Sequence, residues 1–398
     1  MVQYAKSEAI NRQKSAAKSV GQFYRLTGDT SMKEIVVIGA GKIGSTIARL
    51  LAHSGDYKVT VADRSAEQLA AIEEHKAVVT AVVDIADSKA LVELLKGKFA
   101  VLSAAPYHLT VAIAEAAAAA GIHYLDLTED VESTRAVKRI AAKAETAFIP
   151  QCGLAPGFIS ICANDLASHF DTLESVRMRV GALPQYPSNA LNYNLTWSTD
   201  GVINEYIEPC EAIVEGSLIE VPALEEREEF SLDGVTYEAF NTSGGLGTLC
   251  ETLEGNVRTL NYKTIRYPGH AAIMKALLND LGLRHRREVL KDIFENALPT
   301  TTQDVVIIFV TVSGRKDGRL IQETYANKVY SAVIAGRMHS AIQITTAGSI
   351  CAVLDMLADG SLRAKGFVKQ EEIALDSFLA NRFGHYYAQD QHGHRAAS

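Results

Sequence analysis

Short apolar runs alternate with helical patterns over the first part of this chain. Within the runs nearly every residue is apolar, as in strands buried on both faces, and between them apolar side chains recur at helical spacing. The predicted strands cover positions 35–38, 58–62, 78–83, 99–103, 123–125 and 147–150. The predicted helices cover positions 43–54, 66–74, 88–95, 109–120 and 131–144. This alternation predicts an α/β fold with a doubly wound parallel sheet.

The pattern changes after a glycine-containing turn at 153–157. A helix is predicted at 159–169, but the strand-like runs that follow have few helices between them. These runs cover positions 176–180, 191–197, 211–214, 219–221, 237–240, 257–266, 305–312 and 328–334. They predict a mixed or antiparallel sheet in a second, α+β domain. Because a helix predicted at 347–357 should pack back on the first domain, we expect the second domain to interrupt the first.

Three glycines follow the first predicted strand in the order G-x-G-x-x-G. Gly39 permits a sharp turn, Gly41 lets a pyrophosphate approach the backbone, and Gly44 lets the helix pack closely on the strand. The phosphates would meet the free N–H groups of a helix that begins near Lys42 and Ile43. The motif predicts a Rossmann dinucleotide-binding domain, and the alternative is an ordinary glycine-rich turn between a strand and a helix.

The second predicted strand ends at Asp63, where a carboxylate can accept hydrogen bonds from the adenosine ribose and would repel a 2′-phosphate. This residue favours NAD, although the adjacent Arg64 leaves room for NADP. Further cofactor contacts are expected where later strands end. These residues are Asp84, Ser103, Ala104, Ala105 and Pro106.

Four segments of the chain are therefore expected. They are an N-terminal extension or leader (1–31), an NAD-binding Rossmann domain (32–155), a substrate-binding, catalytic and oligomerising domain (156–345), and a C-terminal return to the Rossmann domain with a tail (346–398). The first segment is basic and acid-poor, which is typical of a transit peptide. We favour an upstream extension, because Met32 stands directly before the first predicted strand.

Composition narrows the class of protein. The 398 residues are 47% hydrophobic and carry a net charge of −8, which disfavours a nucleic-acid partner and supplies enough apolar residues for two cores. The apolar stretch 111–120 is too short to span a membrane, so no membrane association is predicted. Five scattered cysteines show no metal-ligand spacing, and we expect reduced thiols in a cytoplasmic protein without a metal site.

Polar side chains follow the fourth and fifth predicted strands. Tyr107 and His108 come after the fourth strand, and Asp126 and Glu129 lie in the acidic segment after the fifth. The carboxylates of the acidic segment could bind a cation or exchange protons, and the four residues are the candidates for proton transfer. The alternative for the acidic segment is a helix-capping loop, in which Thr128 or Asp130 is the N-cap.

Two segments of the second domain carry further candidates. Thr242, Ser243 and Gly244 open a glycine-rich loop that could donate hydrogen bonds to a carboxylate, or could simply be flexible. The later strand 257–266 places Tyr262, Thr264 and Arg266 on one face. Arg266 offers a planar fork for a carboxylate, with a surface ion pair as the alternative. His270 could transfer a proton or could simply begin a helix.

Taken together, these segments resemble the saccharopine dehydrogenase family, in particular its saccharopine reductase and lysine 6-dehydrogenase branch. The resemblance covers positions 32 to about 360. It rests on the glycine motif at 38–44, Pro106-Tyr107, the turn at 153–157, the loop at 242–246 and the segment at 262–270.

The resemblance implies a dehydrogenase acting on a carbon–nitrogen bond of a lysine-derived amino acid. In its length after Met32 the chain is most similar to the lysine 6-dehydrogenases. We therefore expect NAD-dependent oxidation at the ε-amino group of L-lysine, with ammonia released and the semialdehyde cyclising to piperideine-6-carboxylate. The amino acid would be the partner, bound by a homodimer or homotetramer.

Two alternatives remain open. The first is a saccharopine dehydrogenase that forms L-glutamate, or a related carboxyalkyl-amine dehydrogenase. The extra carboxylates of such substrates need cations, which Arg177, Arg179, Arg258 and Lys263 could supply. The second is a non-catalytic protein that senses the dinucleotide.

Overall fold

A computed structural model describes residues 32–388 of the chain. Of the two units into which the chain divides, the second begins at Glu34. The predicted N-terminal extension, 1–31, lies outside the described residues. The second unit contains two large sheets, which together position the candidate site.

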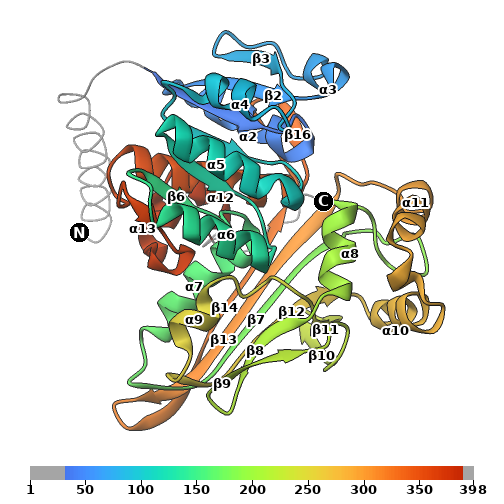
Figure 1. Ribbon diagram of the computed structural model, residues 1–398. Coiled ribbons are helices and arrows are strands. Elements are labelled where there is room, and N and C mark those ends of the chain that lie inside the picture. Colours follow the sequence, from blue (N-terminus) through green and yellow to red (C-terminus); the bar gives the residue numbers. More distant parts are fainter. Residues whose placement is uncertain (1–31, 389–398) are drawn as a thin grey trace, which may run out of the picture. The chain divides into compact units, whose positions relative to one another are not determined.

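The first sheet has seven strands in the order β17-β6-β5-β4-β1-β2-β3 (Figure 1). Their bounds are β1 Lys33–Ile38, β2 Tyr57–Asp63, β3 Val78–Val82, β4 Ala100–Ser103, β5 His123–Asp126, β6 Ala147–Ile149 and β17 Gly366–Phe367. Parallel pairing joins β1 to β4, β4 to β5, β5 to β6, β6 to β17, and β2 to β3. This is the predicted doubly wound sheet, and the prediction of the fold class is confirmed.

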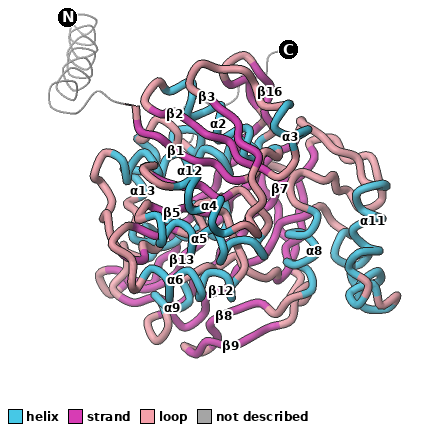
Figure 2. Tube along the Cα trace, turned by 45° about the horizontal axis from the view of Figure 1, so that its top comes forward, coloured by secondary structure: helices cyan, strands magenta, loops and turns pink. Residues whose placement is uncertain are grey.

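Helices cover both faces of this sheet, as Figure 2 shows from a second direction. They are α2 Lys42–Ser54, α3 Ala66–Ala70, α4 Ser88–Leu95, α5 Thr110–Ala120 and α6 Val131–Ala141. In β1, Ile35 and Val37 belong to a core shared with α2, whereas Val36 and Ile38 belong to a core shared with α4, α5 and α6. Because neighbouring side chains enter opposite cores, the strand is apolar throughout, and this explains the unbroken apolar runs in the sequence.

The second sheet has eight strands and mixed pairing. Its main order is β10-β11-β12-β7-β13-β14, and β8 pairs with both β12 and β9. The bounds are β7 Thr172–Pro184, β8 Cys210–Val214, β9 Ser217–Val221, β10 Glu228–Leu232, β11 Val235–Asn241, β12 Val257–Arg266, β13 Asp304–Lys316 and β14 Arg319–Tyr330. The pair β12–β7 is parallel, while β11–β12, β7–β13 and β13–β14 are antiparallel. A small additional sheet pairs β15 Ala332–Ile334 with β16 Arg337–His339.

The remaining helices surround the second sheet and return the chain to the first. They are α7 Ile159–Ala167, α8 Thr199–Ile207, α9 Leu249–Leu253, α10 His270–Lys275, α11 Arg287–Ala297, α12 Ala341–Ala358 and α13 Leu375–Ala380. The helix α12 is long and apolar enough to cross a membrane. However, 78% of its residues are buried inside the protein, where the helix packs against α2. It is a core helix, and β17 then adds the last strand to the first sheet.

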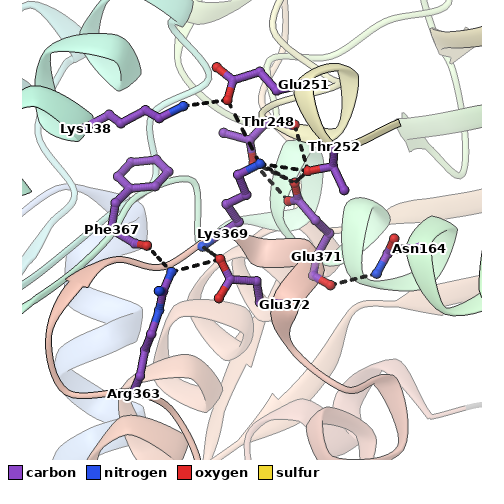
Figure 3. A network of polar contacts seen from close by, with 10 residues as sticks. All are labelled: Lys138, Asn164, Thr248, Glu251, Thr252, Arg363, Phe367, Lys369, Glu371 and Glu372. Atoms are coloured by element: carbon purple, nitrogen blue, oxygen red, sulfur yellow. Dashed lines mark hydrogen bonds and ion pairs between the residues drawn. The ribbon is translucent and has the colours of Figure 1, made fainter. Parts of the chain in front are cut away.

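A polar network fastens the returning chain to the second domain (Figure 3). The Glu371 carboxylate accepts hydrogen bonds from Thr248 Oγ1 at 2.9 Å and Thr252 Oγ1 at 2.6 Å. Its backbone carbonyl accepts a hydrogen bond from Asn164 Nδ2 at 2.8 Å, and Lys369 Nζ donates to Thr252 Oγ1. Since Thr248 is the N-cap of α9 and Thr252 lies within it, the network holds the helix that follows the glycine-rich loop.

Several predicted elements are wrong or wrongly bounded. The predicted strand 191–197 is irregular chain, because the Asn189 amide bonds the backbone of Tyr193 and competes with strand pairing. The following helix α8 was not predicted. The predicted strand 328–334 is divided between the ends of β14 and β15, and the predicted helix 347–357 begins earlier, at Ala341.

Candidate active site

The three glycines of the motif have three different environments. Gly39 has a φ of 104°, and a Cβ built on it would lie 2.8 Å from the carbonyl oxygen of Ala104. A Cβ on Gly44 would lie 1.8 Å from the carbonyl oxygen of Gly39. A Cβ on Gly41 would meet nothing within 4 Å. The first and third glycines are therefore required by the fold itself, whereas Gly41 faces open space.

That open space lies at the start of α2, the side from which a dinucleotide pyrophosphate would approach the backbone. Gly41 is the N-cap and makes no side-chain hydrogen bond to the helix, so the first backbone N–H groups remain available for an anion. Lys42 is exposed beside them and Ile43 is half-buried. These features fit the predicted cofactor, whose phosphates the helix N-terminus would hold.

Asp63 is oriented toward this loop by the backbone. Its Oδ2 accepts a hydrogen bond from the Ala40 N–H at 2.8 Å, and its Oδ1 accepts one from the Ser65 N–H at 2.8 Å. The carboxylate is thus held beside the glycine loop, with Arg64 exposed next to it, and its contact with a ribose stays a prediction. Asp84 is exposed and bonds the Ala86 N–H at 3.0 Å.

A cavity of about 270 Å³ opens where the ends of the two sheets meet. The first domain contributes Ile43, Ala104, Ala105, Pro106, Tyr107, Leu127, Thr128 and Glu129, with Gly153, Leu154 and Ala155 from the turn that follows. The second contributes Val180, Gly181, Ala182, Trp197, Ser198, Asp200, Gly201, Glu205, Tyr262, Thr264 and Arg266, and α12 adds Ile342 and Thr346. Residues from the cofactor domain and from the second sheet therefore share one cavity.

Arg266 is the buried cation of this cavity, with a residue exposure of 3%. Its Nε donates to the Tyr206 hydroxyl at 2.9 Å, and its Nη1 donates to Thr264 Oγ1 at 2.9 Å and to the Ile265 carbonyl at 2.8 Å. Among residues 32–388, Nη2 has no hydrogen-bond partner and the guanidinium has no ion pair. The protein therefore holds one side of the fork and leaves the other available to an anion in the cavity.

His270 lies behind Arg266 and does not line the cavity. Its Nδ1 is 2.9 Å from the Leu191 carbonyl, which can only accept, so Nδ1 carries the proton and Nε2 accepts from the Tyr206 hydroxyl at 3.0 Å. Burial, together with the charge of Arg266, lowers the pKa of His270 to about 3. The residue is neutral at physiological pH and orients Arg266 through Tyr206, so its position does not suit the proton transfer considered from the sequence.

Two carboxyl groups face the cavity from opposite domains. Glu129 comes from the loop after β5, and its Oε1 lies 3.1 Å from a Cβ built on Gly201 of α8. Burial, with the negative charges of Glu205 and Asp130, raises the pKa of Glu129 well above its usual value. Burial also raises the pKa of Glu205 to about 7, although the charge of Arg266 opposes this. Near neutral pH these groups can therefore hold a proton, either on one carboxyl group or shared between the two.

The other predicted catalytic residues are distributed differently. Tyr107 lines the cavity, whereas the neighbouring His108 is exposed outside it. Asp126 is buried below the cavity, where it accepts hydrogen bonds from the Thr128 and Gln151 N–H groups and the Tyr124 hydroxyl. Burial raises the pKa of Asp126 to about 6. Its three donors show that this carboxyl organises the loop that carries Glu129.

The glycine-rich loop of the second domain lies behind the cavity wall. The Ser243 hydroxyl donates to the Pro209 carbonyl at 2.8 Å, and the Ser243 N–H donates to the Glu205 carbonyl at 3.0 Å. A Cβ on Gly244 would lie 2.6 Å from the carbonyl oxygen of Glu129. Thr242 is buried and likewise does not line the cavity. The donors of Ser243 are thus satisfied by the protein, and the structure brings this loop to Glu129 rather than to a substrate.

None of the cations considered for a substrate with several carboxylates lines the cavity. Arg179 and Lys263 both pair with Glu228 elsewhere on the sheet, Lys263 at 3.1 Å, and Arg258 pairs with Glu215 at 2.8 Å. Arg177 also lies away from the cavity. Among the cavity-lining residues in the described part of the chain, Arg266 is the one cation.

Two residues that line the cavity, Glu205 and Trp197, were not predicted from the sequence as site residues. Glu205 lies on the unpredicted helix α8. A serine at position 198 was a weak sequence signal for the start of this helix, because Ser198 is the N-cap of α8 and accepts a hydrogen bond from the Gly201 N–H at 3.2 Å. A Cβ on Gly201 would lie 2.3 Å from the Trp197 ring, so this helix needs glycine there. A helix-interior glycine obscures the helical pattern, which accounts for the omission.

Within residues 32–388 no cluster of three or more His, Cys, Asp or Glu side chains could hold a metal ion. The five cysteines are buried and make no disulfide.

Comparison with known proteins places this arrangement in a family. The family model described as "Saccharopine dehydrogenase NADP binding domain" matches residues 35–149. The model described as "Saccharopine dehydrogenase C-terminal domain" matches residues 153–383, which is more than half of the chain. The chain belongs to the saccharopine dehydrogenase family. The two matched segments together account for most of the described residues, and they meet at the turn that separates the two sheets.

The chain is similar to several known proteins at low sequence identity. The mitochondrial alpha-aminoadipic semialdehyde synthase of Rattus norvegicus is 21% identical over 319 residues, and that of Mus musculus is 20% identical over 314 residues. Each match covers 75% of this chain, which spans about a third (34%) of the length of those relatives. Apo saccharopine dehydrogenase (L-Glu forming) from Saccharomyces cerevisiae matches with a TM-score of 0.70 and 17% identity, over 85% of this chain and 94% of that one. At this identity the structural likeness establishes the fold.

Proposed function

We propose that this member of the family catalyses the NAD-dependent oxidative deamination of L-lysine at its ε-amino group. The products would be ammonia and the 6-semialdehyde, which cyclises to piperideine-6-carboxylate. The observation that carries the proposal is the charge of the cavity, which offers one cation, Arg266, together with the acidic side chains of Glu129 and Glu205. A third acidic residue, Asp200, pairs with Lys291 at 2.7 Å.

This charge pattern matches lysine better than saccharopine. Lysine has one carboxylate and two ammonium groups, so one arginine and more than one carboxyl group complement it. Saccharopine has three carboxylates, of which at least two would enter the cavity without a cation. An unpaired carboxylate in a buried site is costly, and this cost opposes saccharopine as the substrate.

The residues of the cavity can be assigned roles in this reaction. Arg266 holds the α-carboxylate with the free side of its fork. Glu129 removes a proton from the ε-ammonium, so that the nitrogen lone pair can assist departure of hydride from Cε. When bound, the nicotinamide supplies a two-electron acceptor for that hydride. Water then adds to the carbon of the resulting iminium group and releases a proton to solvent. Glu129 returns its proton to the nitrogen, and the carbon–nitrogen bond breaks to give the semialdehyde and ammonium. The Tyr107 hydroxyl lies in the same cavity.

NAD is the proposed cofactor because Asp63 is held beside the glycine loop, where it would oppose a 2′-phosphate. NADP use is the alternative outcome. A ratio of kcat/KM values for the two dinucleotides would decide between them.

A substrate screen tests the proposal. The purified full chain is incubated with L-lysine, L-saccharopine or another amine, each with NAD or NADP, and the reduced nicotinamide is followed by its absorbance. The expected result is turnover of lysine with release of ammonia. Turnover of saccharopine with release of glutamate would replace the proposal with the L-glutamate-forming activity. Binding of the dinucleotide without turnover of any amine would favour a sensor.

A further inference from the structure

Glu205 has an unusual combination of burial and lack of partners. Its residue exposure is 9%, and its Oε2 has no hydrogen-bond partner within the described part of the protein. No cation lies within ion-pair distance of it among residues 32–388. A buried carboxyl oxygen without a donor is energetically unfavourable unless a ligand or water supplies one.

The fold does not need this carboxyl group to hold α8 in place. The helix is anchored by its Ser198 cap, by the ion pair of Asp200 with Lys291 at 2.7 Å, and by the hydrogen bond from Arg287 to the Asn204 side chain at 3.0 Å. Its backbone is further joined to the glycine-rich loop at Ser243. The Glu205 side chain is therefore free to serve the cavity that it lines.

Glu205 and Arg266 face the same part of the cavity without touching. The next residue along α8, Tyr206, accepts the hydrogen bond from Arg266 Nε at 2.9 Å, and the charge of Arg266 acts on the Glu205 carboxyl group. The two groups are nevertheless not within 4 Å of each other. An anion-binding group and a cation-binding group that stand close but unpaired match a ligand whose carboxylate and ammonium share one carbon atom.

Glu129 has a different electrostatic environment. It follows β5 on the cofactor side of the cavity, and the negative charges of Glu205 and Asp130 act on it. The two carboxyl groups thus enter the cavity from different elements, Glu129 from the loop after β5 and Glu205 from α8.

We propose that Glu205 binds the α-ammonium group of the substrate, so that Arg266 and Glu205 together select an L-α-amino acid over a plain ω-amino acid. This inference rests on the proposed function, because it takes the substrate to lie with its α-carbon at Arg266 and its ε-amine at Glu129. It assigns Glu205 to substrate specificity and leaves proton removal to Glu129.

The test compares L-lysine with 6-aminohexanoate, which has the same carboxylate, chain and terminal amine but no α-ammonium. The variant Glu205→Gln keeps the shape of the side chain and removes the charge. Its kcat/KM for lysine is expected to fall by about 10- to 100-fold, the range for loss of a hydrogen bond between charged groups. For 6-aminohexanoate the change is expected to be less than about 3-fold, because no ammonium contacts residue 205 in either protein.

Glu208→Gln is the matched control, because Glu208 follows α8 and pairs with Arg287 at the surface at 3.1 Å. This control variant should change kcat/KM for neither substrate. Glu205→Asp supplies a second variant that retains the charge at a shorter reach, and it should lose less lysine activity than Glu205→Gln. Thermal unfolding of each variant reports whether the fold is retained.

Equilibrium binding of the same two compounds to the full chain, measured by calorimetry, separates this inference from the proposed function. If lysine binds with Glu205-dependent affinity but is not turned over, the function fails and the ammonium site stands. If Glu205→Gln weakens lysine and 6-aminohexanoate equally, the inference is overturned even when lysine is the true substrate. Equal binding of the two compounds by the unaltered protein would also overturn it.

Discussion

Substitution of Arg266 tests the assignment of the substrate carboxylate most directly. Arg266→Lys keeps a positive charge but replaces a planar fork with a single ammonium group. The native guanidinium makes three hydrogen bonds to Tyr206, Thr264 and the Ile265 carbonyl, at distances between 2.8 and 2.9 Å. A lysine at this position cannot satisfy these acceptors and the substrate at once. Arg266→Met removes the charge altogether while retaining an unbranched apolar side chain of comparable length.

The magnitudes follow from the type of contact that is lost. Loss of one charged hydrogen bond costs about 1.5–3 kcal/mol, so Arg266→Lys should raise the KM for lysine by about 10- to 100-fold. Truncating one partner of a buried charge pair costs about 2–5 kcal/mol, so Arg266→Met should raise the KM for lysine by about 30- to 5,000-fold. The affinity for NAD should change by less than about 3-fold, since Arg266 does not contact the glycine loop.

The assay is steady-state kinetics with lysine at saturating NAD, together with NAD binding measured by the change in protein fluorescence. Arg258→Met is the control, because Arg258 lies on the same strand, β12, but is exposed and pairs with Glu215. An unchanged KM for lysine in Arg266→Met would refute the reasoning. So would an NAD affinity that falls by the same factor as the lysine affinity, because Arg266 would then act on the whole fold.

Three further predictions concern the cofactor loop and the buried titratable groups. Gly44→Ala should lower the melting temperature and weaken NAD binding by more than about 10-fold, since its Cβ would lie 1.8 Å from a carbonyl oxygen, whereas Gly41→Ala should weaken NAD binding with an unchanged melting temperature. The folded-state pKa of His270, about 3, lies below that of the unfolded chain, so stability should fall as pH decreases below about 6.5. The free energy of unfolding should fall by about 2 kcal/mol at pH 5, as measured by urea unfolding at pH 7 and 5. In His270→Gln this loss should be absent, and the same dependence of the unfolding free energy on pH in the variant would contradict the prediction. Finally, because Glu205 has a pKa of about 7 and must be ionised to bind an ammonium, kcat/KM for lysine should rise with pH through about 7. Glu205→Gln should make that rise smaller without abolishing it, because Glu129 must still be ionised to remove a proton.

Local elements of the first domain were predictable because their signals are contiguous. The strand β1, the glycine turn and α2 form a single segment, and the conformations that Gly39, Gly41 and Gly44 permit do not depend on distant residues. The alternation along β12 also predicted that Tyr262, Thr264 and Arg266 share a face, and all three line the cavity. A strand period of two is a property of the backbone, so it survives any tertiary arrangement.

Other features of the site depended on contacts that the sequence does not display. Thr242, Ser243 and Gly244 have the composition of an anion-binding loop, but packing against Glu129 and Pro209 turns them away from the cavity. His270 has the chemistry of a proton carrier, but burial beside Arg266 keeps it neutral. In both cases the same side chains would behave differently in another environment.

The sequence by itself therefore determined the dinucleotide-binding domain, the mixed sheet that interrupts it, and the face of β12 that bears Arg266. These features follow from local periodicity and from the backbone freedom of glycine. Only the tertiary structure decided which charges share the cavity, because Glu129, Glu205 and Arg266 come from three separate elements. Burial then sets the pKa of each carboxyl group, and pairing elsewhere removes Arg179, Arg258 and Lys263 from the site. The charge of the cavity, from which the substrate is inferred, is a product of the folded chain.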